Sequence, residues 1–206
     1  MSQYPKLQID SPIETYEVMT QHIKTLKGVD GLSCEIGLRR GGGTKVILDA
    51  FMENDDKRTH ICLDPYGNII YNDIVGPHRS DYTDDIRNET LSELYRYASD
   101  NRLNVLFFNL EDSEFYQRFF DGVPVYDQEK IMMNKYCFVH VDGQHDTASV
   151  LLAAKFFITR VSIRGVIAFD NTDHYDHGPV HQLVITNKFI MVDDVMNKKI
   201  YKRVLA

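Results

Sequence analysis

Apolar runs alternate with amphipathic segments along most of this 206-residue chain. Runs that are continuously apolar and short enough to be strands lie at residues 32–38, 59–64, 104–110, 135–142 and 164–171. Segments with helical periodicity separate them, at residues 44–54, 88–101, 113–120 and 147–160. Strands that are apolar on both faces are typical of a parallel sheet covered by helices on both sides. The pattern therefore predicts an open, mostly parallel α/β sheet with right-handed crossovers.

The segment ahead of the first strand has its own helix signals. Ser11 is suited to cap a helix, Pro12 suits its first turn, and Glu14 stands where a capping box needs an acid. Gly28 suits the C-terminal end of the same helix. We expect an N-terminal helical extension within residues 1–30, packed on the edge of the sheet.

The last part of the chain departs from the alternation in a different way. Residues 188–205 hold two apolar runs joined by a polar turn, which predicts an antiparallel hairpin. Placed at the edge of the sheet, this hairpin would complete a Rossmann-like fold with helices on both faces. The length suffices for a sizeable core, and we expect one domain over residues 1–206.

One connection is too long for an ordinary strand-to-helix loop. Residues 66–88 follow the second predicted strand and contain Tyr66, Tyr71 and Tyr82. Connections of this length are usually lids, binding loops or disordered segments. The tyrosines favour an ordered flap over the carboxyl edge of the sheet, where it would shape a binding pocket.

Charge and composition exclude several classes of partner. The formal net charge is −7 at pH 7, and the chain lacks the basic stripe of nucleic-acid-binding proteins. No apolar run approaches the roughly 20 residues of a membrane span, and the N-terminus lacks the basic start and apolar core of a signal peptide. We therefore expect a soluble, cytoplasmic protein without nucleic-acid or membrane partners. The cysteines, Cys34, Cys62 and Cys137, stand singly in apolar runs, which is typical of buried thiols.

Acidic side chains end several of the predicted strands. They are Glu35, Asp64, Asp142 and Asp170. The carboxyl ends of parallel strands lie at one edge of a sheet, where open α/β sheets bind their ligands. Carboxylates that converge there place negative charge where a ligand must use it or the protein must neutralise it. We interpret this edge as the functional site, with structural salt bridging as the alternative.

A glycine cluster follows the first strand. Gly37, Gly41 and Gly43 would permit a tight turn and a close backbone approach to a ligand. Thr44 would then begin a helix whose first amide groups face that ligand. The cluster is not a phosphate-binding loop, because no lysine followed by serine or threonine comes after the glycines. The spacing from Gly37 to Gly41 also disfavours a nicotinamide dehydrogenase, and a plain strand-to-helix turn is the simpler alternative.

Three segments together resemble one family of enzymes. "CEIGLRRGGGT" resembles an E-x-G-x-x-x-G-x-S/T motif, and "NLEDSEF" resembles a G-D-S segment that follows the third strand. "FVHVDGQHD", a helix and then "RGVIAFDN" resemble a D-G-x-H block, a helix and a G-G-x-x-x-x-D-D block. These motifs are similar to those of class I methyltransferases of the family that includes macrocin O-methyltransferase and the cephalosporin hydroxylase-like proteins. The resemblance covers residues 32–172.

The resemblance implies S-adenosylmethionine as cofactor and assigns its contacts. The loop from Gly37 to Gly43 would hold the methionine part, Asp64 would bind the ribose hydroxyls, and Asp142 would lie beside the sulfonium and the acceptor. Asp112 and Ser113 would lie near the adenine. The implied cofactor-binding set is Glu35, Gly37, Gly41, Gly43, Thr44, Asp64, Asp112, Ser113 and Asp142.

The resemblance also implies a metal and a catalytic pair. Magnesium would be held by Asp142, Asp170 and Asn171, although Asn171 replaces a carboxylate of the family motif and supplies no charge. The ion would lower the pKa of an acceptor hydroxyl, and His145 would take up its proton. The acceptor would be a small hydroxylated molecule, a sugar or another polyol. Whether the enzyme is a homo-oligomer stays open.

Two alternatives differ from methyl transfer. The first is a module that binds S-adenosylmethionine or another nucleotide without turnover. The second is an iron oxygenase in which His140 and Asp142 would be joined by His174, His177 or His181. The alternation of strands and helices disfavours the oxygenase, because such enzymes usually have all-β barrels. The same distant histidines could bind zinc, although histidines in a polar loop are more often solvated.

Overall fold

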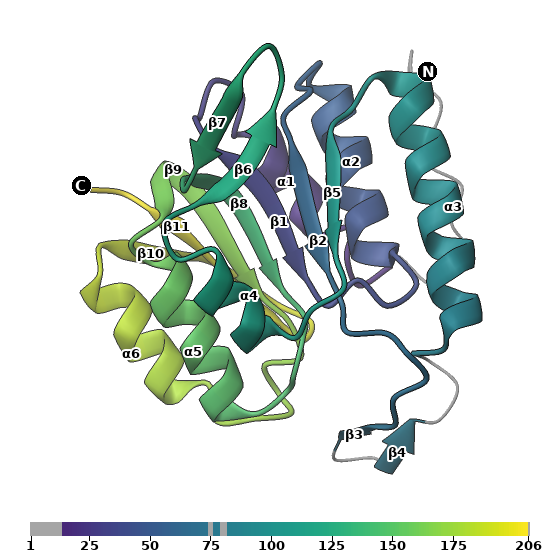
Figure 1. Cartoon of the computed structure of the whole chain (residues 1–206). Coiled ribbons are helices and arrows are strands. Elements are labelled where there is room, and N and C mark those ends of the chain that lie inside the picture. The colour runs from purple at the N-terminus through teal and green to yellow at the C-terminus, as the bar shows by residue number, and fades with distance from the viewer. Residues whose placement is uncertain (1–13, 74–75, 79–81, 206) are drawn as a thin grey trace.

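A seven-stranded sheet forms the centre of the protein (Figure 1). The computed structural model describes residues 14–73, 76–78 and 82–205. The strand order is β10-β11-β9-β8-β1-β2-β5, and β11 is antiparallel to both of its neighbours while the remaining pairs are parallel. The strands are β1 (Leu32–Ile36), β2 (His60–Leu63), β5 (Val105–Phe108), β8 (Tyr136–Val141), β9 (Val161–Phe169), β10 (Phe189–Val195) and β11 (Lys198–Arg203). The predicted open α/β sheet with an antiparallel C-terminal hairpin is confirmed.

Helices cover both faces of this sheet (Figure 1). They are α1 (Met19–Lys24), α2 (Gly42–Glu53), α3 (Asp84–Asn101), α4 (Asp112–Arg118), α5 (Thr147–Phe157) and α6 (Gly178–Thr186). α4, α5 and α6 contribute to one apolar cluster, and α1, α2 and α3 contribute to the clusters on the opposite face. None of these described helices has the length and apolarity that crossing a membrane requires.

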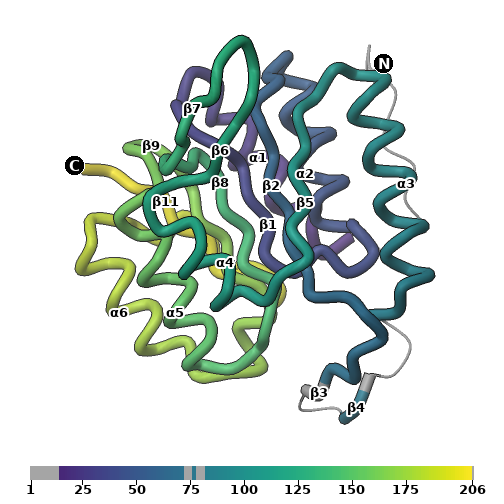
Figure 2. Tube along the Cα trace, viewed as in Figure 1, coloured from purple at the N-terminus to yellow at the C-terminus, as the bar shows by residue number. Residues whose placement is uncertain are grey.

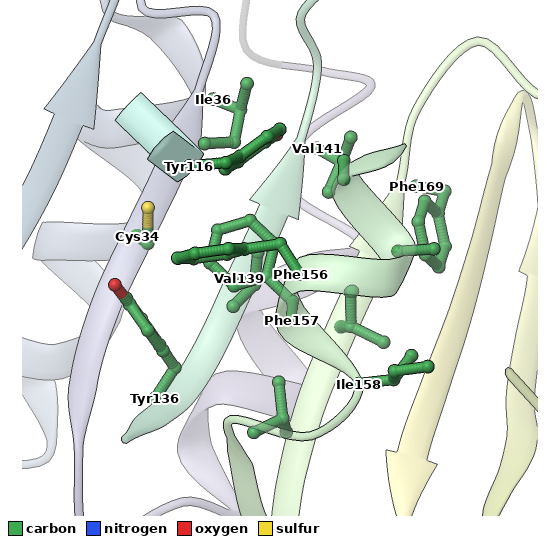
Figure 3. Packing of buried hydrophobic residues seen from close by; sticks show 14 of the residues in the cluster. Cys34, Ile36, Tyr116, Tyr136, Val139, Val141, Phe156, Phe157, Ile158 and Phe169 are labelled. Carbon is green, nitrogen blue, oxygen red and sulfur yellow. The ribbon is translucent and has the colours of Figure 1, made fainter. Parts of the chain in front are cut away.

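The strand side chains alternate between these two layers. Cys34 and Ile36 of β1 pack with Val139 and Val141 of β8 against α5, as Figure 3 shows. The intervening residue of β1, Glu35, therefore faces the α1 and α2 side, where it is buried among polar partners. Because successive side chains of a strand point to opposite faces, this alternation decides which side chains face α5 and which face α2 and the site.

The first helix differs from its prediction. Ser11 and Pro12 lie outside the described residues, and α1 is preceded by turns from Glu14 onward. It does not pack on the sheet edge. Met19 and Ile23 are fully buried against α2 and the inward side chains of β8 and β9, because their apolar surface needs the middle of a sheet face for cover.

Other elements add detail that the apolar pattern did not predict. α3 begins at Asp84, earlier than predicted, because the Thr83 side chain accepts a hydrogen bond from the Ile86 amide and caps the helix there. α6 forms where a polar loop was expected. Short hairpins also form, from β3 (Tyr71–Asp73) with β4 (Gly76–His78) and from β6 (Val123–Tyr126) with β7 (Lys130–Met133). β3 and β4 belong to the predicted flap and lie beyond the carboxyl ends of β1 and β2 (Figure 2).

Candidate active site

A cavity of about 360 Å³ opens at the carboxyl edge of the sheet. Its walls come from the loop after β1, the start of α2, the segment ahead of α1, and the ends of β8 and β9. Three of the four strand-end acids, Glu35, Asp142 and Asp170, line it. The convergence expected from the parallel topology is therefore present, and the fourth acid, Asp64, lies beside the same loop.

Glu35 belongs to a buried polar network on the α2 side of β1. His140 Nδ1 lies 2.8 Å from its Oε1 atom, and the Thr44 hydroxyl donates to its Oε2 atom. Thr44 Oγ1 is also 3.1 Å from His60 Nε2, and Ser33 Oγ is 3.0 Å from His60 Nδ1. Burial lowers the pKa of His60 to about 3, so its ring is neutral. Thr44, which the resemblance assigned to the cofactor, connects Glu35 to this interior network.

Two of the glycines are required by the protein itself. Gly37 has a φ of +87°, and a Cβ there would lie 2.1 Å from the carbonyl oxygen of Asp142. A Cβ on Gly43 would lie 1.9 Å from Glu35 Oε1. The loop backbone therefore does approach other groups closely, but at these two positions the groups are the Asp142 carbonyl, just after β8, and the Glu35 carboxylate. Gly41 is the residue that caps α2.

Asp64 offers an acceptor that no described residue uses. The Arg39 amide donates to Asp64 Oδ2 at 2.8 Å, whereas Oδ1 is buried and has no hydrogen-bond partner among the described residues. Burial raises the pKa of Asp64 to about 7, against the backbone hydrogen bond from Arg39. A buried carboxylate oxygen without a donor is suited to accept hydrogen bonds from a ligand's hydroxyl groups.

Asp112 and Ser113 stand apart from the main cavity. They line a neighbouring hollow of about 230 Å³ together with Gln144 and Ser149. Burial raises the pKa of Asp112 to about 6, and a Cβ on Gly143 would lie 2.6 Å from its Oδ2 atom. The structure thus places the two expected adenine contacts beside the β8–α5 turn and not within the same cavity as Asp142.

Asp142 and His145 form the centre of the cavity wall. His145 Nε2 lies 3.3 Å from Asp142 Oδ1, and Tyr16 donates to Asp142 Oδ2 at 3.0 Å. The Asn171 side-chain nitrogen is 3.3 Å from Asp142 Oδ1 and 2.9 Å from His145 Nε2. The His145 backbone amide donates to the hydroxyl of Tyr71, in the predicted flap, at 3.4 Å. The sequence identified the pair but not Tyr16, which precedes α1 and carries no motif.

Asp170 is paired inside the protein. The Lys198 ammonium is 2.8 Å from its Oδ1 atom and 2.7 Å from its Oδ2 atom, and Lys198 is fully buried. Burial opposes ionisation of Asp170, but the contacts with His140 and Lys198 outweigh it and lower the pKa of Asp170 to about 2. Burial likewise opposes charging of His140, but the contacts with Asp170 and Glu35 raise the pKa of His140 to about 10. Lys198 lies in a segment that the sequence placed in a simple edge hairpin.

The residues present do not fit the expected magnesium ion. Both oxygens of Asp170 contact an ammonium group, and both oxygens of Asp142 contact protein groups. Asn171 Oδ1 accepts a hydrogen bond from Asn197 at 2.7 Å, and Asn171 has a φ of +50°, a conformation that asparagine tolerates. A hard cation needs oxygen lone pairs that are directed toward it. Here each of those oxygens already accepts a hydrogen bond or contacts an ammonium group, and Asn171 supplies no charge.

The alternative metal sites do not assemble either. His140, Asp142 and Asp170 each offer a ligand atom within 4.8 Å of the others, but both ring nitrogens of His140 face carboxylates. His177 Nε2 and His181 Nδ1 lie 3.1 and 2.9 Å from the Tyr201 hydroxyl instead. In the part of the chain that the structure describes, no cluster of metal ligands includes the distant histidines. The described residues therefore do not bring together the oxygenase triad or the zinc site that the sequence left as alternatives.

Comparison with known proteins agrees with this architecture. The O-methyltransferase NovP is 18% identical, with a TM-score of 0.58 over 93% of this chain and 80% of that protein. The O-methyltransferase from Bacillus cereus, in complex with SAH, is 13% identical, with a TM-score of 0.56 over 97% of this chain and 84% of that one. TomG from Streptomyces achromogenes, in complex with SAM, is 9% identical, with a TM-score of 0.56 over 97% and 83%. The TM-scores show a shared fold, and at identities this low the similarity shows the fold alone.

The sequence comparisons decide the family. No curated protein matches the chain in sequence. A family model described as a methyltransferase domain matches residues 34–172, which is more than half of the chain and includes the glycine loop and the ends of β8 and β9. The protein therefore belongs to this methyltransferase-domain family and is a methyltransferase.

Proposed function

We propose that the protein transfers a methyl group from S-adenosylmethionine to a hydroxyl oxygen of a small molecule. The observation that carries the proposal is one cavity that is lined both by Asp142 and His145 and by the glycine loop after β1. The names of the three structurally similar proteins support the same chemistry, since all of them are called O-methyltransferases and one holds SAM.

The cofactor would lie along the carboxyl ends of β1 and β2. The backbone of the loop from Gly37 to Gly43 would contact its methionine part, and the unpaired Oδ1 atom of Asp64 would accept from its ribose. Glu35 and Thr44 would act indirectly, by fixing the start of α2 through their buried hydrogen bond. When bound, S-adenosylmethionine supplies a methyl group already activated on a sulfonium, so the protein mainly has to align the acceptor.

His145 is the group best placed to take the acceptor's proton. It lines the cavity, and its Nε2 atom is near Asp142 Oδ1, so a proton gained by the ring would be stabilised by that carboxylate. Tyr16 holds the other oxygen of Asp142 and keeps this carboxylate in place. The pair can therefore remove a hydroxyl proton without a metal, and magnesium assistance is not part of the proposal.

The acceptor is proposed to be a sugar or another small polyol. Besides the glycine loop, the cavity is lined by polar side chains that can hydrogen-bond to hydroxyl groups, namely Thr15, Arg40, Tyr82 and Asn197. The motif resemblance to the macrocin O-methyltransferase family supports the same class. The predicted flap, which contains Tyr82, would close over this acceptor.

The proposal is tested by cofactor titration and by a transfer assay. We expect S-adenosylmethionine to bind in a calorimetric titration, and methyl label to pass from it to a member of a panel of sugars and polyols. His145→Gln should lower the rate, whereas His174→Gln, whose ring lies 6.0 Å from that of His145, serves as the matched control. Absence of cofactor binding would overturn the proposal. Binding without transfer to any hydroxylated acceptor would favour the non-catalytic module.

A further inference from the structure

A buried lysine stands at the edge of the sheet where the family resemblance implies a metal. Lys198 is the first residue of β11 and is fully buried. Its ammonium contacts both oxygens of Asp170, lies 3.3 Å from Asn197 Oδ1, and lies 4.7 Å from the centre of the Tyr16 ring. Lysine is almost never fully buried unless it is paired, and here Asp170 is the acid that pairs with it.

The contacts of Asp170 leave little capacity for another cation. Besides Lys198, the Asn171 amide donates to its Oδ1 atom at 2.7 Å, and His140 Nε2 lies 3.4 Å from its Oδ2 atom in an ion-pair contact. His140 in turn contacts Glu35 at 2.8 Å. Two basic groups, Lys198 and His140, thus alternate with two acids, Glu35 and Asp170. A divalent ion at Asp170 would have to displace the ammonium or lie beside it with the same sign of charge.

We propose that the Lys198 ammonium supplies the fixed positive charge at this edge in place of a divalent ion, and that the enzyme works without a metal. Lys198 does not line the cavity, so it is a positioning residue. Its contacts with Asp170 and Asn197 support Asn171, whose amide group contacts both Asp142 and His145. The catalytic part of this inference rests on the proposed function, whereas the exchange of metal for ammonium does not.

The exchange is tested by metal binding, independently of activity. We expect electron paramagnetic resonance to find no saturable Mn²⁺ binding to the unaltered protein, and its melting temperature to be the same in EDTA and in excess Mg²⁺. Lys198→Ala removes the ammonium group from both oxygens of Asp170. The variant should therefore melt earlier, gain a bound Mn²⁺ signal, and be restabilised by Mg²⁺. Lys199→Ala is the matched control, because Lys199 pairs at 2.6 Å with the exposed Asp194.

Each outcome decides the inference. Saturable Mn²⁺ binding to the unaltered protein that disappears in Asp170→Asn would overturn it, and this measurement stands even if Lys198→Ala does not fold. A folded Lys198→Ala protein that binds no more Mn²⁺ than Lys199→Ala would overturn the exchange as well. Titration with S-adenosylmethionine on the same samples separates the two proposals. If the unaltered protein does not bind S-adenosylmethionine, the proposed function is overturned, and the Mn²⁺ result alone decides the role of Lys198.

Discussion

Replacing Gly43 by alanine tests whether the glycine loop serves the buried network as the structure indicates. Gly43 is the second residue of α2, and a Cβ there would lie 1.9 Å from Glu35 Oε1 and 3.0 Å from His140 Nδ1. Neither neighbour has free space, since both side chains are at most 1% exposed. The new methyl group must therefore push the Glu35 carboxylate off its hydrogen bond with His140.

The opposing contributions to the free energy of unfolding can be compared. In a helix, alanine is favoured over glycine by about 1 kcal/mol, so propensity alone predicts a more stable protein. Against this, overpacking a filled site costs about 1–3 kcal/mol, and breaking a buried ion pair costs about 3–5 kcal/mol. Because Glu35 retains its bond from Thr44, we expect a net loss of about 3 kcal/mol, which lowers the melting temperature by roughly 6–12 °C in a chain of this size.

The assay is thermal and urea unfolding of Gly43→Ala beside Gly178→Ala. Gly178 is exposed at the start of α6, and a Cβ there would lie 3.0 Å from the exposed Asp176 carboxylate, which can rotate away. The control should therefore change little. A Gly43→Ala protein as stable as the unaltered one would refute the reasoning. The double variant Gly43→Ala/Glu35→Ala should lose less than the sum of the single losses, because removing the carboxylate removes the clash.

Three further predictions concern the site and its support. Burial raises the pKa of Asp64 to about 7, above its ordinary value of 3.8, so acidification through pH 7 stabilises the fold but removes the charge that ribose hydroxyls would bind. Cofactor affinity measured by calorimetry should therefore fall on acidification, and Asp64→Asn should abolish this pH dependence. Tyr16→Phe removes a donor to Asp142 and should lower kcat about tenfold; an unchanged kcat would contradict this. Arg58→Met loses three hydrogen bonds to backbone carbonyls ahead of β1, the ion pair with Asp56 and a cation–π contact with Phe51 of α2. The free energy of unfolding should therefore fall by about 2–4 kcal/mol, with cofactor affinity retained.

The sheet and the location of the site could be predicted because both follow from local pattern and topology. Continuous apolar runs predict strands, and parallel strands share one carboxyl edge. Glu35, Asp142 and Asp170 could therefore be expected at one edge, although they are far apart in sequence. They line one cavity because β1, β8 and β9 are neighbours in the sheet. Asp142 and His145 were also predictable as a pair, because only two residues of a strand-to-helix turn separate them.

The partners of these acids could not be predicted, because they depend on distances between strands. Glu35 alternates with Cys34 and Ile36, but only the register with β8 puts it opposite His140. Gly43 looks the same in sequence whether a ligand or a carboxylate approaches it. Lys198 follows a turn in a hairpin, where lysines usually reach solvent, and nothing local indicates that it points inward to Asp170.

α6 was missed for a different reason. Its first turn contains glycine, proline and histidine in "DHGPVH", which suggested a polar loop. The proline in fact suits a first helical turn, and Val180 and Val184 supply one buried stripe against the sheet. His177 and His181 then lie on the same side of the helix start, where both reach Tyr201 of β11. Their shared partner is a tertiary contact, and so only the fold reveals that they stabilise packing.

Asn171 and Lys198 both bear on the charge of the site. The motif that residues 164–171 resemble has two neighbouring acids after the fifth strand, and here the second position holds Asn171, which supplies no charge. Lys198 places a positive charge against both oxygens of the first acid, Asp170. A divalent ion would thus lack one carboxylate ligand and would find an ammonium group beside another. In the proposed arrangement this protein cation balances Asp170, while Asp142 stays in contact with His145.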